Sequence, residues 1–207
     1  MQADSPTPVR RVALYVTKAL KSFPRSDVTL DMPLVESVWV EIATPKNKKS
    51  NFCWLLIYKH PGANIDEFNG KLDEKMKLFN RNNYQLYILG DMNIDSHPPT
   101  EAYLDMLYSN NLLPIITKLS HLTYHSATLI DHIYTNSTCK VVSGIVMVDI
   151  SDHLPVVSVQ IYKLRNTTLL SIIEITAILI KNLIYEISMQ STGMLSIVII
   201  CMRQLLK

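Results

Sequence analysis

The sequence predicts a layered sandwich of the α/β or α+β class, and three observations lead to this fold. Short runs rich in Val, Leu, Ile, Trp and Tyr are separated by clusters of Pro, Asn, Ser and Lys, which is typical of strands joined by loops. Two segments instead repeat apolar residues at helical spacing, as amphipathic helices do. No internal repeat is visible, so we expect layers in which strands dominate and two helices interrupt them.

Each expected element follows from its own residues. Strands are expected at residues 12–16, 38–42, 53–58, 84–89, 130–135, 141–148 and 156–161. One helix is expected from residue 65, where apolar side chains recur at Ile65, Phe68, Leu72, Met76 and Phe79. Asn64, with Glu67 three residues later, resembles a capping box at the start of this helix. Thr100 is placed to cap a second helix that ends at residues 110–111.

Composition and charge bound the class of protein. With 207 residues and 48% hydrophobic content, the chain can build one domain with a substantial core, so disorder throughout is not expected. Twenty Lys and Arg against eighteen Asp and Glu give a net charge of +2, so any contact with nucleic acid must come from local patches. Two basic clusters are candidates, the loop at residues 46–49 and the group formed by Arg10, Arg11, Lys18 and Lys21.

Cysteine usage and the N-terminus indicate an intracellular protein. The three cysteines, Cys53, Cys139 and Cys201, lie far apart and form no C-x-x-C pair, which favours reduced thiols over a zinc finger. Residues 1–8 are polar and contain proline, so they lack the apolar core of a secretory signal peptide. We therefore expect no signal peptide and a place in the nucleus or the cytoplasm.

The composition changes after Tyr162, so we expect the main domain at residues 12–162. Residues 163–207 are crowded with Ile and Leu, contain one Gly and no Pro, and predict an apolar, helical tail of unknown role. A membrane span needs about 20 mostly apolar residues, and charged residues interrupt the longest candidate at Glu174, Lys181 and Glu186. We therefore expect a buried or amphipathic tail, with a membrane span as the less favoured alternative.

Polar side chains stand at the ends of several predicted strands, where a rigid scaffold can bring distant residues together. The strand at residues 84–89 is followed by Gly90-Asp91-Met92-Asn93, and in an extended chain Asp91 and Asn93 point to the same side. Asp131 lies inside an apolar run, where a carboxylate is costly to bury unless another group pairs with it. These residues are therefore candidates for a common site.

A third motif, Ser151-Asp152-His153, precedes the strand expected at residues 156–161. An imidazole oriented by one carboxylate, with a second carboxylate free for a metal ion, is a workable hydrolytic arrangement. Each motif taken singly also has a structural explanation. Gly-Asp-x-Asn is common in turns, Asp131 alone could face a loop, and Ser-Asp-His can cap an element.

Together and in this order, the motifs resemble the endonuclease/exonuclease/phosphatase superfamily. Four stretches carry the resemblance: Ile57-Tyr58-Lys59-His60-Pro61, Gly90-Asp91-Met92-Asn93, Ile130-Asp131-His132-Ile133-Tyr134 and Ser151-Asp152-His153-Leu154-Pro155-Val156. Three further stretches, at residues 12–16, 36–42 and 126–133, are similar to the endonuclease domains of non-LTR retrotransposons. The resemblance covers about residues 12–160 and agrees with the strands and helices expected from the sequence pattern.

The resemblance implies a four-layered α-β-β-α sandwich with the motif loops converging at one end. It also implies the catalytic residues. Asp91 would orient or deprotonate the attacking water, with Asn93 fixing the geometry beside it. His153 would hydrogen-bond the scissile phosphate while Asp131 holds its imidazole in the correct state. Tyr58 would contact the same phosphate through its hydroxyl.

The metal ion and the substrate contacts are likewise implied by the resemblance. Asp152 matches the position of a metal-binding carboxylate, and Mg²⁺ is the expected ion, with Mn²⁺ as the alternative. Substrate-binding contacts are expected from Tyr58, Ser151 and Thr123. In the family, a segment before the first of these strands supplies an Asn and a metal-binding Glu, and the eleven residues before Val12 contain neither. We therefore expect a sandwich incomplete at its N-terminus, with impaired activity, and the apolar tail as a candidate cover for the gap.

Three functions follow from these expectations. The first is metal-dependent phosphodiester hydrolysis of DNA by a retroelement-type endonuclease domain, with DNA as partner and no small-molecule cofactor. The second is a phosphatase of the same superfamily acting on lipid or inositol phosphates, against which the stretch at residues 126–133 argues. The third is a non-catalytic pseudoenzyme, or a remnant that binds nucleic acid through the basic clusters. The sequence does not indicate an oligomeric state.

Overall fold

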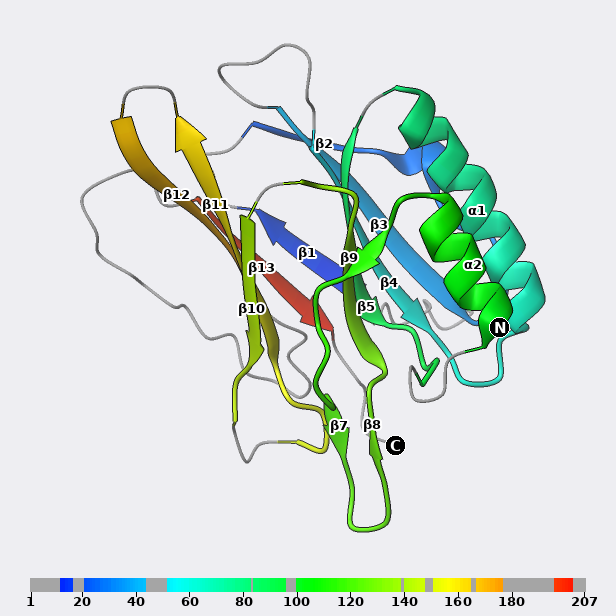
Figure 1. Cartoon of the computed structure of the whole chain (residues 1–207). Helices are drawn as coiled ribbons and strands as arrows, with labels where there is room; N and C mark the ends of the chain where they lie inside the picture. The colour runs from blue at the N-terminus through cyan, green and yellow to red at the C-terminus, as the bar shows by residue number, and fades with distance from the viewer. Residues whose placement is uncertain are drawn as a thin grey trace, which may run out of the picture.

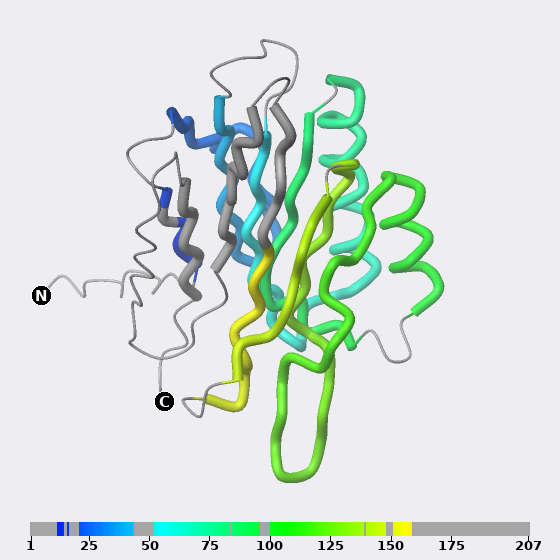
Figure 2. The backbone as a smooth tube through the Cα atoms, turned by 60° about the vertical axis from the view of Figure 1, so that its left-hand side comes forward, coloured from blue at the N-terminus to red at the C-terminus, as the bar shows by residue number. Residues whose placement is uncertain are grey.

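The computed structural model describes residues 12–16, 21–43, 52–82, 84–95, 100–138, 140–147, 151–164, 167–176 and 196–202. Within them, two β-sheets pack face to face, and two α-helices cover the outer face of the larger sheet (Figure 1 and Figure 2). The predicted layered α/β fold is therefore confirmed. The basic clusters at residues 46–49 and at Arg10, Arg11 and Lys18 lie outside the described residues.

The larger sheet has six strands in the order β2-β3-β4-β5-β9-β6. Its strands are β2 (Ser22–Pro24), β3 (Val35–Ile42), β4 (Phe52–Lys59), β5 (Gln85–Asp91), β6 (Leu113–Pro114) and β9 (Asp131–Thr135), with a short 3-10 helix, η1, at Ser26–Val28. β4 and β5 run parallel, whereas the other neighbouring pairs are antiparallel. The four long strands of this sheet, β3, β4, β5 and β9, and both helices are those that the sequence pattern predicts, with their ends shifted by a few residues.

The helices α1 (Ile65–Arg81) and α2 (Glu101–Ser109) begin where the sequence places their caps. The side chain of Asn64 accepts a hydrogen bond from the backbone N–H of Glu67 at 3.0 Å, which satisfies one free donor of the first turn of α1. Thr100 stands at the N-cap of α2, but its hydroxyl makes no capping hydrogen bond. The sequence thus predicted the position of the N-cap of α2 correctly, but the expected side-chain hydrogen bond is not formed.

Strand β4 is buried along its whole length and separates two apolar cores. Alternate residues on one face, among them Leu55 and Ile57, pack with the apolar side of α1. The opposite face, with Leu56 and Tyr58, packs in the core between the two sheets. Because side chains alternate along a strand, this division decides which polar residues face the other sheet.

The smaller sheet has five strands in the order β1-β13-β12-β11-β10. These strands are β1 (Val12–Val16), β10 (Lys140–Ile145), β11 (Val156–Leu164), β12 (Thr167–Thr176) and β13 (Ser196–Met202). A two-stranded hairpin, β7 (His121–Leu122) with β8 (Ala127–Thr128), projects from the end of the molecule near which both sheets converge (Figure 1 and Figure 2).

The prediction of a helical tail at residues 163–207 is wrong for the residues described there, which form the end of β11 and the strands β12 and β13. Their sequences are rich in Ile, Val and Thr, whose branched side chains lose freedom in a helix and favour an extended chain. β12 pairs with β11, and β13 pairs with β12 and β1, so the tail strands join the two ends of the sheet. The domain boundary at residue 162 remains a prediction.

Of the four layers that the resemblance implies, the described part of the chain shows three, in the order α-β-β. Among the described residues, both α-helices lie on the larger sheet, and no helix is found on the outer face of the smaller one. Among the described residues, neither helix has the length and apolar character that crossing a bilayer demands.

Gly90 allows β4 and β5 to approach closely one residue before Asp91. Its φ is +143°, a conformation that residues with a Cβ rarely adopt. A Cβ placed on it would lie 1.8 Å from the carbonyl oxygen of Ile57. Any larger residue would therefore push the two central strands apart at the point where the first polar motif begins.

We predict that Gly90→Ala lowers the free energy of unfolding by more than about 2 kcal/mol, because strain and a backbone clash act together. Gly70→Ala is the matched control. No atom lies within 4 Å of a Cβ at this exposed position in α1, so the same change should stabilise by roughly 0.5–1 kcal/mol. Denaturant titration followed by circular dichroism measures both, and equal unfolding midpoints for the two variants would contradict the prediction.

Candidate active site

Three polar side chains line up across the central strands at one end of the larger sheet. In the strand register, Asp91 of β5 lies opposite Tyr58 of β4 on one side and Asp131 of β9 on the other. All three belong to the face that packs towards the smaller sheet, and all three are buried. Sheet register therefore brings together residues that are more than thirty positions apart in the sequence.

His153 completes this group from the segment that leads into β11. Its Nδ1 lies 2.9 Å and 3.1 Å from the two carboxylate oxygens of Asp131, and both side chains are nearly inaccessible to solvent. The hydrogen bond places the Nδ1 proton on the Asp131 side, so Nε2 is the ring nitrogen left for other partners. The backbone N–H of His153 also donates to the hydroxyl of Ser151 at 3.0 Å.

Asn93 is tied to the ends of two strands. Its backbone N–H donates to the Asp91 carboxylate at 3.0 Å, and its side-chain amide donates to the carbonyl of Lys59 at 2.9 Å. Its φ of 46° lies in the left-handed region, where Asn is among the residues best tolerated. Asn93 thus holds the turn after β5 against the end of β4, beside the Asp91 carboxylate.

Asp152 is the exposed carboxylate of the group. Its side chain is 53% accessible to solvent, and the Ser151 hydroxyl donates to it at 3.1 Å. Nε2 of His121 lies 3.4 Å from its other carboxylate oxygen. Asp152 therefore stands at the mouth of the site, whereas Asp91 and Asp131 form its floor.

His121 also lies at the site, although no sequence motif indicated it. Its ring contacts the ring of His153 with centroids 4.5 Å apart, and the two backbones form an isolated antiparallel β-bridge. Its Nδ1 lies 3.3 Å from the Thr128 hydroxyl. A single His in a two-residue strand has no motif around it, and only the meeting of β7 with the segment before β11 reveals its neighbours.

Thr123 lies at the start of the turn between β7 and β8, and its hydroxyl serves that turn. It lies 2.8 Å from the Ser126 hydroxyl and accepts hydrogen bonds from the backbone N–H groups of His125 and Ser126. The predicted contact between Thr123 and substrate remains a prediction.

Burial and neighbouring charge set the protonation of the group. Burial and the charge of Asp131 raise the pKa of Asp91 to about 7, although His153 and Asn93 act against them. Burial alone lowers the pKa of the His153 imidazole, but the hydrogen bond and charge of Asp131 outweigh it and raise that pKa. Burial likewise raises the pKa of Asp152, but the hydrogen bond from Ser151 and the charge of His153 leave it lowered.

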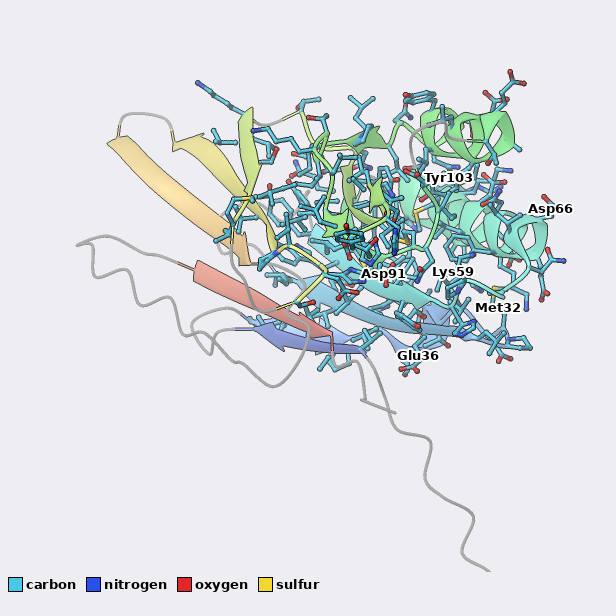
Figure 3. All side chains as sticks on the ribbon, turned by 90° about the horizontal axis from the view of Figure 1, so that it is seen from below. Met32, Glu36, Lys59, Asp66, Asp91 and Tyr103 are labelled. Carbon is cyan, nitrogen blue, oxygen red and sulfur yellow. The ribbon has the colours of Figure 1, made fainter. Side chains whose placement is uncertain are left out.

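A buried lysine lies near Asp91 on the helix side of β4. Burial lowers the pKa of Lys59, and the charge of Asp91 opposes this shift. In Figure 3 the labelled side chains of Asp91 and Lys59 lie close together at the end of the sheet, whereas Asp66 lies out on α1.

The donor set fits a divalent cation. The ligand atoms of Asp91, Asp131 and His153 lie within 4.8 Å of one another, and so do those of His121, Asp152 and His153. Two carboxylates buried side by side repel each other, and burial first, then the charge of Asp131, raises the pKa of Asp91. A divalent ion nearby would offset it, and the half-exposed Asp152 offers an oxygen at the mouth.

The chain has the fold of the endonuclease/exonuclease/phosphatase proteins. The endonuclease domain of TRAS1, a telomere-specific non-LTR retrotransposon, matches with a TM-score of 0.52 at 13% sequence identity, over 70% of this chain and 78% of that domain. At this identity the likeness shows the fold alone. No family model matches the sequence, and no curated protein does.

Two bacterial proteins of the endonuclease/exonuclease/phosphatase family also match. One is from Leptotrichia buccalis, with a TM-score of 0.47 and 16% identity, over 68% of this chain and 60% of that one. The other is from Bacteroides thetaiotaomicron, with a TM-score of 0.47 and 17% identity, over 71% of this chain and 63% of that one. The match thus spans about three-fifths of the length of each bacterial protein.

The raised pKa of Asp91 predicts a stability that falls as pH rises. Between its ordinary value of 3.8 and about 7, Asp91 binds more protons in the folded than in the unfolded chain, so the free energy of unfolding decreases through this window. Asp91→Asn removes the effect. In EDTA, we expect the Tm of this variant to equal that of the wild type near pH 4 and to exceed it by several degrees at pH 8, because about 1 kcal/mol shifts Tm by roughly 2–4 °C in a domain of this size. Calorimetric scans showing the same pH dependence for both proteins would contradict this assignment.

Proposed function

We propose that this domain hydrolyses phosphodiester bonds in DNA with the help of a divalent metal ion, as a retroelement-type endonuclease domain. The observation that carries the proposal is the buried Asp131–His153 pair, 2.9 Å apart, beside Asp91 at one end of the sheet. A paired His and a neighbouring carboxylate with a pKa near neutrality are what acid–base chemistry on a phosphate ester needs.

His153 is proposed to stabilise the charge that develops on the phosphate. Its Nδ1–H is held by Asp131, which keeps the ring in one orientation and favours the charged imidazolium. Nε2 then donates a hydrogen bond to a phosphate oxygen, and the donor is already in place when the charge develops. Asp131 acts as a positioning residue because both of its carboxylate oxygens face His153.

Asp91 is proposed to orient the attacking water and to accept its proton. A pKa of about 7 makes the Asp91 carboxylate a stronger base than an ordinary aspartate while it is still largely ionised above neutral pH. The backbone N–H of Asn93 donates to one carboxylate oxygen of Asp91 and fixes the orientation of this carboxylate. Tyr58, the neighbour of Asp91 on β4, is proposed to contact the same phosphate.

Asp152 is proposed to hold the metal ion, Mg²⁺ or in its place Mn²⁺. When bound, the ion would neutralise phosphate oxygens and lower the pKa of a bound water. The Ser151 hydroxyl, which donates to Asp152, orients this carboxylate towards the solvent-facing side of the site. A carboxylate that remains half-exposed suits Mg²⁺, which keeps several of its waters when it binds to protein.

DNA as the substrate rests on the sequence resemblance at residues 126–133 and on the surface beside the site. The β7–β8 hairpin carries Tyr124, whose side chain is 94% exposed, with His125 packed against it at 4.8 Å. An exposed aromatic side chain at the edge of a hydrolytic site can stack on a base. These features favour a nucleic acid over an inositol phosphate headgroup.

We predict that the purified chain nicks supercoiled plasmid in Mg²⁺ and that His153→Ala reduces the rate at least about 100-fold, the usual contribution of a positioned acid or base. Asp131→Asn should cause a similar loss, and EDTA should stop the reaction. Gel electrophoresis of the plasmid over time measures all of these rates. Asp66→Asn, an exposed position on α1 away from Asp91 (Figure 3), is the control and should cleave like the wild type.

Other results of this assay would distinguish the endonuclease from the pseudoenzyme and the phosphatase. A folded wild-type chain that does not cleave plasmid or oligonucleotides would leave the pseudoenzyme as the correct description. Release of phosphate from a phosphoinositide without cleavage of plasmid would identify a phosphatase. Equal rates for the wild type and His153→Ala would show that a contaminating nuclease is responsible.

A further inference from the structure

We propose that His121, Asp152 and His153 form a binding site for a transition-metal ion of the zinc class at the mouth of the candidate active site. One ligand atom from each residue lies within 4.8 Å of the others. His121 comes from β7 and the other two from the segment before β11, and the β-bridge between the two histidines fixes these backbones beside each other. The site therefore exists in the fold before any ion binds.

Both imidazoles are oriented by a partner on Nδ1. In His153 this partner is the Asp131 carboxylate at 2.9 Å, and in His121 it is the Thr128 hydroxyl at 3.3 Å. In His153 this contact leaves Nε2 as the second ring nitrogen, and in His121 Nε2 faces the Asp152 carboxylate at 3.4 Å. A carboxylate or hydroxyl behind a histidine is the usual second layer of a metal site, because it sets the tautomer and the angle of the ring.

The contact between His121 and Asp152 has the geometry of two metal ligands more than that of a hydrogen bond. Nε2 of His121 and the carboxylate oxygen of Asp152 are 3.4 Å apart, which is longer than a well-formed hydrogen bond. Ligands at about 2.0 Å from a tetrahedral Zn²⁺ lie about 3.3 Å from one another. The observed separation thus matches one edge of such a tetrahedron without movement of either side chain.

The site is open to solvent on one side. Side-chain exposure increases from 5% at His153 to 19% at His121 and 53% at Asp152, so the side of the cluster formed by Asp152 faces solvent. Three protein ligands with one open direction leave room for a water as the fourth ligand. Entry needs no rearrangement of the buried floor.

The chemistry of the donors selects the class of ion. Two imidazole nitrogens with one carboxylate suit Zn²⁺, Co²⁺, Ni²⁺ or Cu²⁺, whereas Mg²⁺ prefers oxygen ligands and water. The inference does not depend on nuclease activity. If the proposed function holds, a zinc ion on Nε2 of His153 occupies the atom that would donate to the phosphate, so the ion and the substrate would exclude each other.

The test measures metal binding alone. The full chain, freed of metal with a chelator and dialysed, is titrated with Zn²⁺ in competition with a chromophoric chelator. We expect one site per chain, and a loss of affinity of at least about tenfold in His121→Ala, because outer contacts alone contribute 10–100-fold. His125→Ala is the matched control, the same change at an exposed position on the same hairpin, and should bind like the wild type.

A second measurement guards against a variant that fails to fold. Co²⁺ added to the intact wild-type chain should give the strong visible absorption of a tetrahedral site, and Zn²⁺ should displace it. Thr128→Val, which removes only the partner of His121 Nδ1, should weaken Zn²⁺ binding less than His121→Ala. A folded His121→Ala that binds as tightly as the wild type, an equal loss in His125→Ala, or a weak octahedral Co²⁺ spectrum would overturn the proposal. Because none of these readouts uses DNA, a chain without nuclease activity can still support it.

Discussion

The antiparallel register between β5 and β9 is the constraint on which the candidate site depends, because it sets Asp91 directly opposite Asp131. A shift of this register by one residue would turn Asp131 to the helix side, where His132 now lies. In the observed register two carboxylates are buried side by side, which is costly without a counter-charge. His153 lies against Asp131, and the raised pKa of its imidazole favours the charged form that would offset this cost.

This end of the molecule also joins the two sheets. The segment that carries His153 hydrogen-bonds with the strand β7 through the backbone of Ser120, Leu122, Asp152 and Leu154. Because the separate hairpin β7–β8 leads into β9 of the larger sheet and β11 belongs to the smaller one, the site lies where segments from both sheets meet. Buried charged side chains destabilise an apolar core. Here Asp91, Asp131 and His153 lie at the end of the sandwich, where backbone hydrogen bonds fix the segments that carry them.

Sequence patterns predicted the elements whose residues carry a strong local signal. The continuous apolar run of β4, the helical spacing in α1 and the capping by Asn64 all match the structure. The Ile- and Leu-rich composition after Tyr162, without Pro, predicted a helix, whereas the described residues of this segment pair with β1 and β11 as strands. Short strands such as β7 and β8 form only because a partner is present, so a local pattern does not predict them.

The sequence by itself determined which residue types stand at the ends of which strands, and hence that Asp91, Asp131 and His153 are candidates for one site. The sequence can identify such candidates because side chains alternate between the two faces of a strand. The residues at a strand end and the face to which they point therefore depend only on nearby residues in the chain. Only the tertiary structure decided that His121 lies against His153, that the Thr123 hydroxyl serves its own hairpin, and that Asp91 is buried deeply enough to have a raised pKa. Those facts depend on distances between segments far apart in the sequence, which packing sets.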